Sequence, residues 1–357
     1  MGRAMHPMIR RAGDWLRCNL FSSLTNSIVS LLALALFGWL GSKLLQWAVI
    51  DAVWSQAGLA ACQALDGRGA CWSVVAEKWR PMLFGIYPQE QQCRPALAVV
   101  LFCAILLGST WRGCWTVPRL LMLWLGGSLL CGWLLAGGAG LTPVPTSLWG
   151  GLPITLMLAV FGTLFAFPLG VLLALGRRSQ MPVLRALSVG YIELVRGVPL
   201  ISVLFMASLM FALFLPEGIN FDKLLRAQVA LILFNAAYLA EVVRAGLQAL
   251  PRGQTEAAQA LGLGYWQTHL FIVLPQALRV TIPAQVNSFI DNFKDTSLVI
   301  VVSIFDFLYA VKQAVVSDLE WRHFFVEGYL FAMAIYWLFC FAMSRYSQWL
   351  EQRLRKV

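Results

Sequence analysis

The strongest constraint on the fold is a series of apolar runs, each of about 20 residues, that recurs along the whole sequence. A helix of that length crosses the hydrocarbon core of a bilayer. Open sheets cannot do so, because lipid offers no partner for unpaired backbone groups, whereas a helix satisfies its own hydrogen bonds. The sequence therefore predicts an all-α, polytopic membrane protein.

The composition agrees with this class. Of the 357 residues, 59% are hydrophobic and 12% are charged, whereas soluble domains carry about 25% charged residues. The net charge is +10, from 27 Lys and Arg against 17 Asp and Glu. These basic residues cluster beside the apolar runs, as membrane topology requires. No separate basic patch interleaved with aromatic residues is present, so we do not expect nucleic acid as a partner.

The apolar runs predict about eight transmembrane helices. They lie at about 27–50, 95–110, 120–139, 152–176, 200–215, 227–246, 281–311 and 327–347. A basic loop is expected to follow the run at 152–176. Arginines cluster near alternate ends of the runs, and the positive-inside rule places those ends in the cytoplasm. Both termini are therefore predicted to be cytoplasmic.

A stretch rich in Pro and Gly, at 141–151, divides the chain into two predicted domains. Residues 1–147 form an N-terminal membrane extension of three helices, with a loop outside the cytoplasm at about 51–94. Residues 148–350 form a second membrane domain with a cytoplasmic loop at 251–275. The outer loop contains Cys62 and Cys71. Disulfides persist outside the cytoplasm, but pairing cannot be deduced from sequence, so bridged and free states both remain open.

The loop at 251–275 has the pattern of a short helix between membrane spans. Thr255 can cap its start, and Glu256 lies in the first turn, where the helix dipole favours a carboxylate. Gly262 can end the helix. One face carries residues at i, i+4 and i+8, which are Ala257, Leu261 and Tyr265.

Two interpretations fit this short helix equally well on physical grounds. A helix outside the membrane with a small-residue face suits docking into a groove on another protein. Alternatively, it is an ordinary amphipathic loop between two membrane helices.

Polar residues interrupt the apolar run at 281–311. Ionisable groups at membrane depth are costly and face a cavity or a partner. One hypothesis is that they line a translocation path. The other, equally weighted, is that Lys294 and Asp295 neutralise charges on neighbouring helices. The candidate path residues are Asn287, Asp291, Lys294, Asp295, Thr296 and Ser297.

Charged pairs border two other runs. We expect Glu193 and Arg196, three residues apart, to pair, and Pro199 to break the helix beside them. A structural role is favoured here over contact with a solute. An interfacial pair of Glu241 and Arg244 is expected in the same way. The candidate structural or gating residues are Tyr191, Glu193, Arg196, Gly197, Pro199, Glu241 and Arg244.

Motifs for catalysis and cofactor binding are missing from the sequence. It contains no G-x-x-x-x-G-K-[ST] loop for ATP phosphates, no H-E-x-x-H and no G-x-S-x-G in a strand-turn-helix context. No pairing of Cys with His predicts a metal site. The motif-bearing region is not repeated, although secondary transporters commonly carry such a repeat. The chain is thus predicted to be no enzyme, and to supply half of a translocation path beside a second chain.

The amino-acid sequence of the loop at 251–275 favours the docking interpretation. Glu256-Ala257-Ala258, then Gly262 after three intervening residues, and Ile272-x-Leu274-Pro275 resemble the EAA loop of ABC-importer permeases. The resemblance implies that Glu256, Ala257, Ala258, Leu261, Gly262 and Pro275 couple this chain to an ATPase.

Three further segments are similar to the polar amino-acid branch of that family, the histidine/glutamine/arginine type. They are Tyr191-x-Glu193-x-x-Arg196-Gly197-x-Pro199-Leu200, Glu241-x-x-Arg244-x-Gly246 and Lys294-Asp295-Thr296-Ser297-Leu298. The resemblance covers about 148–350. In the extension, Gly69-Ala-Cys-Trp72 and Phe84-Gly-x-Tyr87-Pro88 are similar to the long permease subunit of general L-amino-acid importers.

The resemblance implies a type I ABC-importer core in the bacterial inner (cytoplasmic) membrane. It implies two ATPase subunits that bind ATP and Mg, with no cofactor on this chain. It also implies a periplasmic amino-acid-binding protein and a second permease, with a heterodimer favoured over a homodimer. The competing hypothesis is a self-contained secondary transporter or channel that uses Lys294 and Asp295 as an ion relay. A membrane-embedded enzyme is disfavoured because no catalytic constellation is present.

Overall fold

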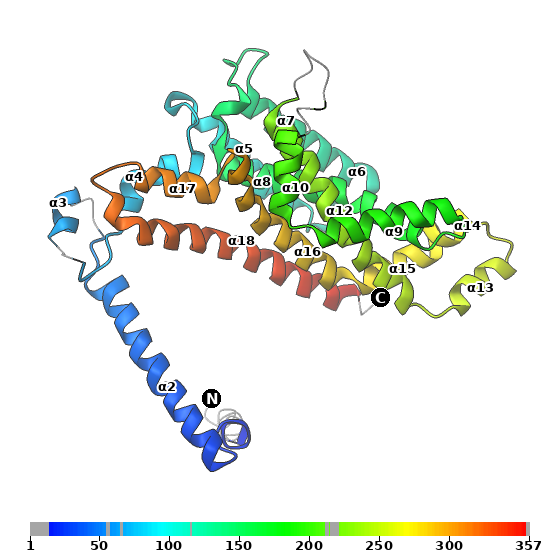
Figure 1. The fold of residues 1–357 in the computed structure, drawn as a ribbon, viewed down its shortest axis with the longest axis horizontal. Coiled ribbons are helices and arrows are strands. Elements are labelled where there is room, and N and C mark those ends of the chain that lie inside the picture. Colours follow the sequence, from blue (N-terminus) through cyan, green and yellow to red (C-terminus); the bar gives the residue numbers. More distant parts are fainter. Residues whose placement is uncertain are drawn as a thin grey trace. The chain divides into compact units, whose positions relative to one another are not determined.

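The structure is a computed structural model that describes residues 14–54, 58–64, 67–114, 116–210, 214 and 221–354. The chain forms two compact units, Met1–Glu77 and Lys78–Val357. Both are built from helices (Figure 1), which confirms the all-α class. Within the described residues, the strands are limited to two segments of two residues each.

The first unit contains one long apolar helix. α2 (Leu24–Leu45) begins where the Ser23 hydroxyl accepts a hydrogen bond from the Asn26 backbone N–H at 3.2 Å. It continues as the π-helical η1 (Gln46–Ile50). Together they form a 27-residue helix that is long and apolar enough to cross a membrane. This helix matches the first predicted span, and none of its residues is buried.

A disulfide cross-links the segment that follows. α3 (Gly58–Gln63) carries Cys62, which is bonded to Cys71. The Trp54 ring stacks on Trp72 with 5.7 Å between the ring centres. Of the two states that the sequence leaves open for these cysteines, the structure contains the bridged one. α4 (Ser73–Phe84) then begins in the first unit and ends in the second.

The second unit is a bundle of long and interrupted helices. Its α-helices are α5 (Cys93–Gly108), α6 (Val117–Leu121), α7 (Gly127–Ala136), α8 (Leu152–Arg177), α9 (Pro182–Gly197), α10 (Leu200–Phe205), α12 (Lys223–Ala249), α13 (Gly253–Ala260), α14 (Tyr265–Gln267), α15 (Leu274–Val280), α16 (Ile282–Asp295), α17 (Phe307–Val316) and α18 (Phe325–Leu354). Short 3-10 or π-helical pieces join or extend them: η2 (Gln89–Gln91), η3 (Arg112–Cys114), η4 (Met122–Gly126), η5 (Thr146–Leu148), η6 (Met206–Met210), η7 (Thr268–Val273), η8 (Thr296–Val302) and η9 (Arg322–Phe324).

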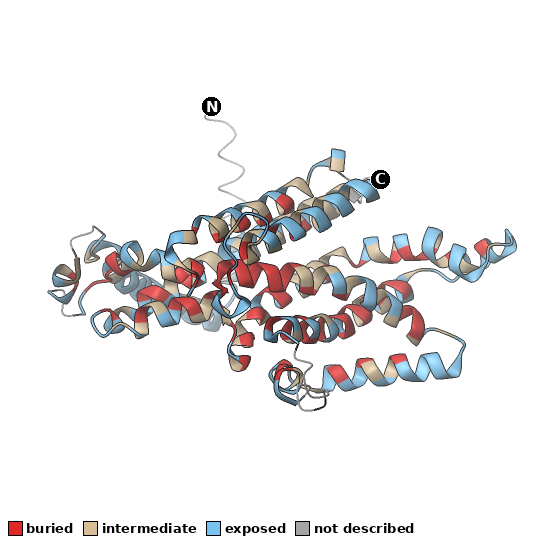
Figure 2. Ribbon diagram, turned by 90° about the horizontal axis from the view of Figure 1, so that it is seen from above, coloured by how far each residue is buried: buried red, intermediate tan, exposed pale blue. Residues whose placement is uncertain are grey.

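The core of this unit is the contact between α8 and α12. A Cβ atom on Gly170 of α8 would lie 2.8 Å from the Cβ of Leu239 and 3.1 Å from the backbone oxygen of Ala236. Ala236 and Ala240 are fully buried. Small residues let the helix backbones approach closely, which is how helices pack in membranes. Figure 2 shows buried residues concentrated in these inner helices.

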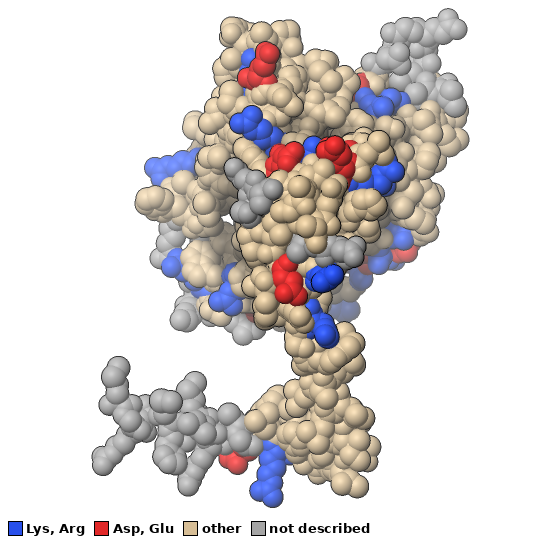
Figure 3. Space-filling model, turned by 90° about the vertical axis from the view of Figure 1, so that its left-hand side faces the viewer, with Lys and Arg blue, Asp and Glu red and all other residues tan. Residues whose placement is uncertain are grey.

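The outer surface of the helices is apolar. Leu169 and Leu172 of α8, Leu129 of α7 and Trp337 of α18 are all exposed. On the face seen in Figure 3, charged side chains form small clusters between large uncharged areas. A soluble protein rarely exposes such continuous apolar surface, so this surface is suited to contact with lipid or with further apolar chains.

A two-stranded parallel sheet ties the start of α8 to the start of α17. β1 (Gly150–Gly151) pairs with β2 (Phe305–Asp306), with Gly150 opposite Phe305. Gly151 has φ +73°, which favours glycine, and a Cβ there would collide with the backbone oxygen of Leu83. The Asp306 carboxylate accepts bonds from the first N–H groups of α17.

The membrane helices are less regular than the sequence predicts. Five helices are long and apolar enough to span: Leu24–Ile50, Pro118–Ala136, Leu152–Arg177, Lys223–Ala249 and Arg322–Arg353. One bent pair, Pro182–Gly197 with Leu200–Met210, passes the same test together. α5 and α17 are shorter apolar helices. The predicted figure of about eight spans therefore includes short and broken elements.

Two stretches differ from their predicted form. The basic loop expected after α8 gives way, after four residues, to the helix α9. α9 ends at Gly197, and α10 starts directly after Pro199. The helical segments on the two sides of this break are bent by 106° relative to one another, so the predicted break at this proline is present. The single span predicted at 281–311 is wrong. α16 ends at Asp295, η8 follows, and Ser303 has left-handed backbone geometry before β2 and α17.

The compact units do not divide at the predicted domain boundary. They separate between Glu77 and Lys78, and α5 packs against α8 within the second unit. The assignment of 1–147 to an extension and 148–350 to a transport domain is a statement about function, and it stays a prediction.

Candidate functional site

The loop at 251–275, called the coupling segment from here on, contains a helix of two turns. α12 ends at Ala249, and α13 runs from Gly253 to Ala260 with Glu256 in its first turn. The N-cap position is Arg252, which makes no side-chain capping bond. The predicted capping role of Thr255 is therefore wrong, because the helix begins two residues earlier and Thr255 lies inside it.

The end of α13 is fixed by local hydrogen bonds. Gly262 has φ +76°, and its N–H donates to the backbone oxygen of Gln259 at 2.9 Å. The N–H of Leu263 donates to the backbone oxygen of Ala258 at 3.1 Å. These two bonds form a Schellman motif, which needs a left-handed residue at this position. Gly262 thus ends the helix as the sequence predicts.

Most of the coupling segment's surface is free within this chain. Ala258 is buried on the side of α13 that packs against η7. At 3.6 residues per turn, Glu256 lies about 160° around the helix from Ala258, and it is exposed together with Ala257. Leu261 is 81% exposed. Gly262, Tyr265 and Pro275 are also exposed. Tyr265, however, belongs to α14 and not to α13.

A cleft of about 750 Å³ lies between the coupling segment and the end of α8. Arg178 and Gln180 line one side, and Glu256 and Tyr265 line the other. Arg178 donates to the backbone oxygen of Leu247 at 2.9 Å, which holds the turn after α8 against α12. Partial burial raises the pKa of Tyr265, and the charge of Arg178 opposes that rise. The phenol is therefore neutral at physiological pH.

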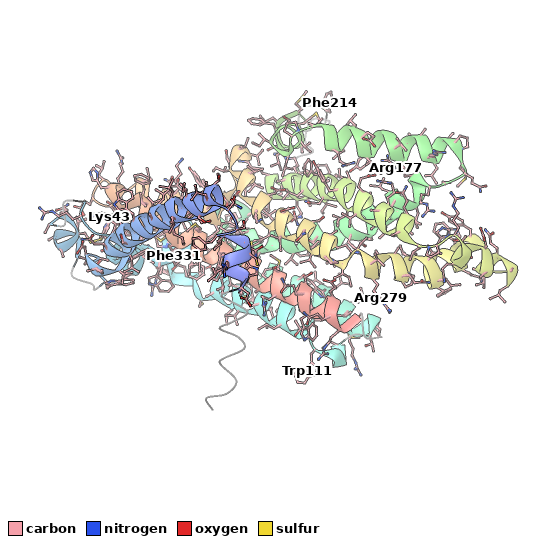
Figure 4. The ribbon with its side chains drawn as sticks, turned by 90° about the horizontal axis from the view of Figure 1, so that it is seen from below. Lys43, Trp111, Arg177, Phe214, Arg279 and Phe331 are labelled. Atoms are coloured by element: carbon pink, nitrogen blue, oxygen red, sulfur yellow. A yellow bond between two sulfur atoms is a disulfide. The ribbon has the colours of Figure 1, made fainter. Side chains whose placement is uncertain are left out.

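An ion network joins the ends of α8, α9 and α12 beside the coupling segment. Glu241 accepts from Arg177 at 2.8 Å and from Arg244 at 2.9 Å, and it lies 3.5 Å from Arg196. Arg177 also contacts Glu193 at 2.8 Å. Figure 4 labels Arg177, and Figure 1 shows α13 and α14 at the same end of the unit as α9. The expected Glu241–Arg244 pair is thus present.

The expected Glu193–Arg196 pair gives way to contacts with other helices, because α9 turns each side chain toward a different partner. Glu193 contacts α8, and Arg196 contacts α12. Arg196 also lies over the Tyr238 ring at 5.8 Å. Tyr191, on the same helix, donates from its hydroxyl to the backbone oxygen of Leu233 at 2.8 Å. These side chains therefore fasten helices to one another.

The candidate path residues lie on α16 and at the start of η8, and they differ in burial. Asn287, Asp291 and Lys294 are exposed on one side of the helix. Lys294 and Asp291 form an ion pair at 3.8 Å on the same helix, so this contact does not neutralise a neighbouring helix. Asp295 and Ser297 are half-buried. The buried hydroxyl of Thr296 donates to the backbone oxygen of Phe293.

Sequence reasoning missed a polar cluster on the opposite side of α16. The Asn292 amide donates to the backbone oxygen of Ala159 at 2.9 Å and to the Thr163 hydroxyl at 3.0 Å. Its oxygen accepts from Asn235 at 2.7 Å. Both asparagines lie in apolar runs, and a buried amide in such a run needs a partner. The two asparagines in apolar runs are therefore a sequence signal for a buried polar contact, but this signal does not identify the partner of either residue.

No group of three or more His, Cys, Asp or Glu side chains with metal-binding geometry occurs among the residues that the structure describes.

Comparison with known proteins decides the family. Residues 166–356 match the family model described as "Binding-protein-dependent transport system inner membrane component". The chain belongs to this family. A protein of Escherichia coli (strain K12), "Inner membrane amino-acid ABC transporter permease protein YhdY", is 47% identical over 96% of this chain and 93% of its own length. As a member, the chain is a multi-pass inner-membrane transport component, and the self-contained secondary transporter or channel is not supported.

Two further comparisons agree with this membership. "Glutamate/glutamine/aspartate/asparagine transport system permease protein BztC" of Rhodobacter capsulatus is 40% identical over 96% of this chain and 93% of its own length. A solved structure described as an amino acid ABC transporter with histidines has a TM-score of 0.50 at 29% identity. The match covers 57% of this chain and 92% of that chain.

Proposed function

We propose that this protein is the permease subunit of an ATP-driven importer for amino acids. It forms half of the translocation path and receives the motion of ATPase subunits through α13. The observation that carries the proposal is the exposed helix α13, whose end is fixed by Gly262 and whose Glu256 is exposed. The names of the similar proteins support the substrate class.

The proposed assembly contains two ATPase subunits, a second permease and a periplasmic amino-acid-binding protein. ATP and Mg bind at the ATPases, since this sequence has no phosphate-binding loop. A second permease covers the polar face of α16, and a different chain is favoured over a second copy of this one. Exposed charges such as Asp291 and Lys294 are costly in lipid, so that face needs a water-filled path or a partner beside it. Both termini face the cytoplasm.

Coupling proceeds by rigid-body motion in this proposal. Closure of the ATPases on ATP moves α13, and the continuous backbone from α12 to α15 carries that motion into the membrane. The ion network at Glu241 holds the cytoplasmic ends of α8, α9 and α12 together, so these helices move as one body.

The test is uptake by the reconstituted assembly in proteoliposomes, with single components left out. We expect uptake of a labelled amino acid only when ATP is enclosed and the ATPases and the binding protein are all present. Gly262→Pro is expected to abolish this uptake, because proline cannot adopt a positive φ. Uptake that persists without any ATPase subunit would overturn the proposal in favour of a self-contained transporter.

A further inference from the structure

We propose that Asn292 is a positioning residue. By bonding to α8 and α12 it sets the rotation of α16 about its own axis, and so it directs the face with Asn287, Asp291 and Lys294 toward the transport path. This inference rests on the proposed function, because it needs that face to border the path.

The bonds of Asn292 reach two other helices. Its side chain is fully buried. The amide nitrogen donates to two oxygens of α8, the backbone oxygen of Ala159 and the hydroxyl of Thr163. The amide oxygen accepts from Asn235 of α12, which itself donates to the backbone oxygen of Leu231. A buried amide with both ends bonded has one favourable orientation, because every alternative leaves polar groups without partners.

The geometry of α16 links this buried anchor to the exposed face. At 3.6 residues per turn, Asn292 lies about 140–160° around the helix from Asn287 and Lys294, and about 100° from Asp291. Fixing Asn292 between α8 and α12 therefore turns the polar residues away from those helices. A rotation of α16 by one residue position, about 100°, would in one of the two directions bring Asp291 onto the side that faces α8 and α12, and Asn287 to within about 40° of it.

The opposing surface of α8 is shaped for this amide. A Cβ atom on Gly162 would lie 2.9 Å from the amide nitrogen of Asn292 and 3.2 Å from its oxygen. Glycine at this position thus leaves the space in which the amide sits. Gln285 provides a contrast on the same helix. It is also buried, but its amide donates to the backbone oxygen of Leu278 and to the hydroxyl of Thr281, immediately before α16 in the chain. These bonds do not fix α16 against α8 or α12.

The experiment compares Asn292→Leu with the matched control Gln285→Leu in the complete reconstituted importer. Both replace a buried amide of α16 by an apolar side chain of similar size. The first readout is the ratio of kcat/KM values for a cationic and an anionic amino acid. The second is the rate at which a membrane-impermeant thiol reagent modifies Ala284→Cys, on the exposed side of α16. For this readout the free cysteines are replaced by Ala or Ser, and the Cys62–Cys71 disulfide is kept.

We expect Asn292→Leu to change both the ratio and the modification rate at least threefold. Gln285→Leu should leave both within twofold of the parent protein, even where it lowers thermal stability. If Asn292→Leu does not assemble, Asn235→Ala replaces it. That variant removes one of the three bonds of Asn292, and a twofold change in both readouts is expected.

Unchanged readouts in the assembled variant overturn the proposal. A changed modification rate with an unchanged kcat/KM ratio also overturns it, because rotation of α16 then does not reach the solute. Failure of the proposed function would give a different set of results from failure of this inference. The parent assembly would show no ATP-driven amino-acid uptake, whereas the modification of Ala284→Cys, which needs no transport, would still report whether Asn292 orients α16.

Discussion

The two helices α13 and α16 are held in place in opposite ways. α13 buries a single residue, Ala258, and its end is fixed by bonds between neighbours in sequence around Gly262. α16 buries Gln285, Ile290, Asn292 and Phe293. Its key bonds run from Asn292 to Ala159 and Thr163, which are 133 and 129 positions away in the chain.

This difference fits the role proposed for each helix. A helix that docks on another protein needs a defined shape and a free surface, and local backbone geometry supplies both. A helix that borders a transport path needs a defined rotation relative to its neighbours, and only contacts from other helices supply that. Substitutions in α13 should therefore alter coupling with little effect on the bundle, whereas substitutions at helix contacts should alter the bundle first.

The largest effect is expected at the contact between α8 and α12. Gly170→Leu places a side chain where even a Cβ atom lies 2.8 Å from Leu239, and overpacking of this kind costs about 3 kcal/mol. Gly190→Leu is the matched control, since a Cβ there meets nothing within 4 Å. The yield and thermal unfolding midpoint of the purified complex should fall for Gly170→Leu alone. Equal effects at both glycines would contradict close packing of α8 on α12.

A smaller effect is expected in the ion network. Glu241→Gln weakens the bonds of Arg177 and Arg244 to a side chain that is 16% exposed, and we expect a loss of about 2 kcal/mol, since hydrogen bonds to charged groups contribute about 1.5–3 kcal/mol. Glu193 is 56% exposed, so Glu193→Gln should cost less than about 1 kcal/mol. Thermal unfolding at low and high salt measures both. A larger loss of stability for Glu193→Gln than for Glu241→Gln would contradict the conclusion that Glu241 is the main acceptor of the ion network.

The smallest change in stability is expected in the coupling segment. Gly262→Ala puts a side chain at φ +76° with open space around it, so the cost is backbone strain of about 1 kcal/mol. At Gly264, φ is −70°, and Gly264→Ala should be nearly neutral. We expect Gly262→Ala to reduce the uptake per ATP hydrolysed several-fold without changing the unfolding midpoint of the membrane domain. A matching loss from Gly264→Ala would argue against the Schellman end of α13.

The same contrast explains which features sequence reasoning predicts. The end of α13 at Gly262 and the break at Pro199 are predicted because each depends on the backbone preference of one residue. The start of α13 is missed because Arg252 takes the N-cap position without a capping side chain. The Glu193–Arg196 pair is wrong because tertiary contacts with Arg177 and Glu241 compete successfully with a local i, i+3 pair. The partners of Asn292 could not be predicted, because no local pattern joins it to Ala159 or Asn235.

The most direct test of the central claim is made at Glu256, which is exposed on α13. Uptake and ATP hydrolysis are measured in the same proteoliposomes for the parent protein, Glu256→Arg, and the charge reversal Glu90→Arg outside the coupling segment. We predict that Glu256→Arg lowers uptake at least tenfold, with either loss of the ATPases from the complex or hydrolysis that no longer responds to the binding protein, while Glu90→Arg behaves as the parent does. Unchanged uptake with Glu256→Arg would contradict the assignment of α13 as the coupling helix.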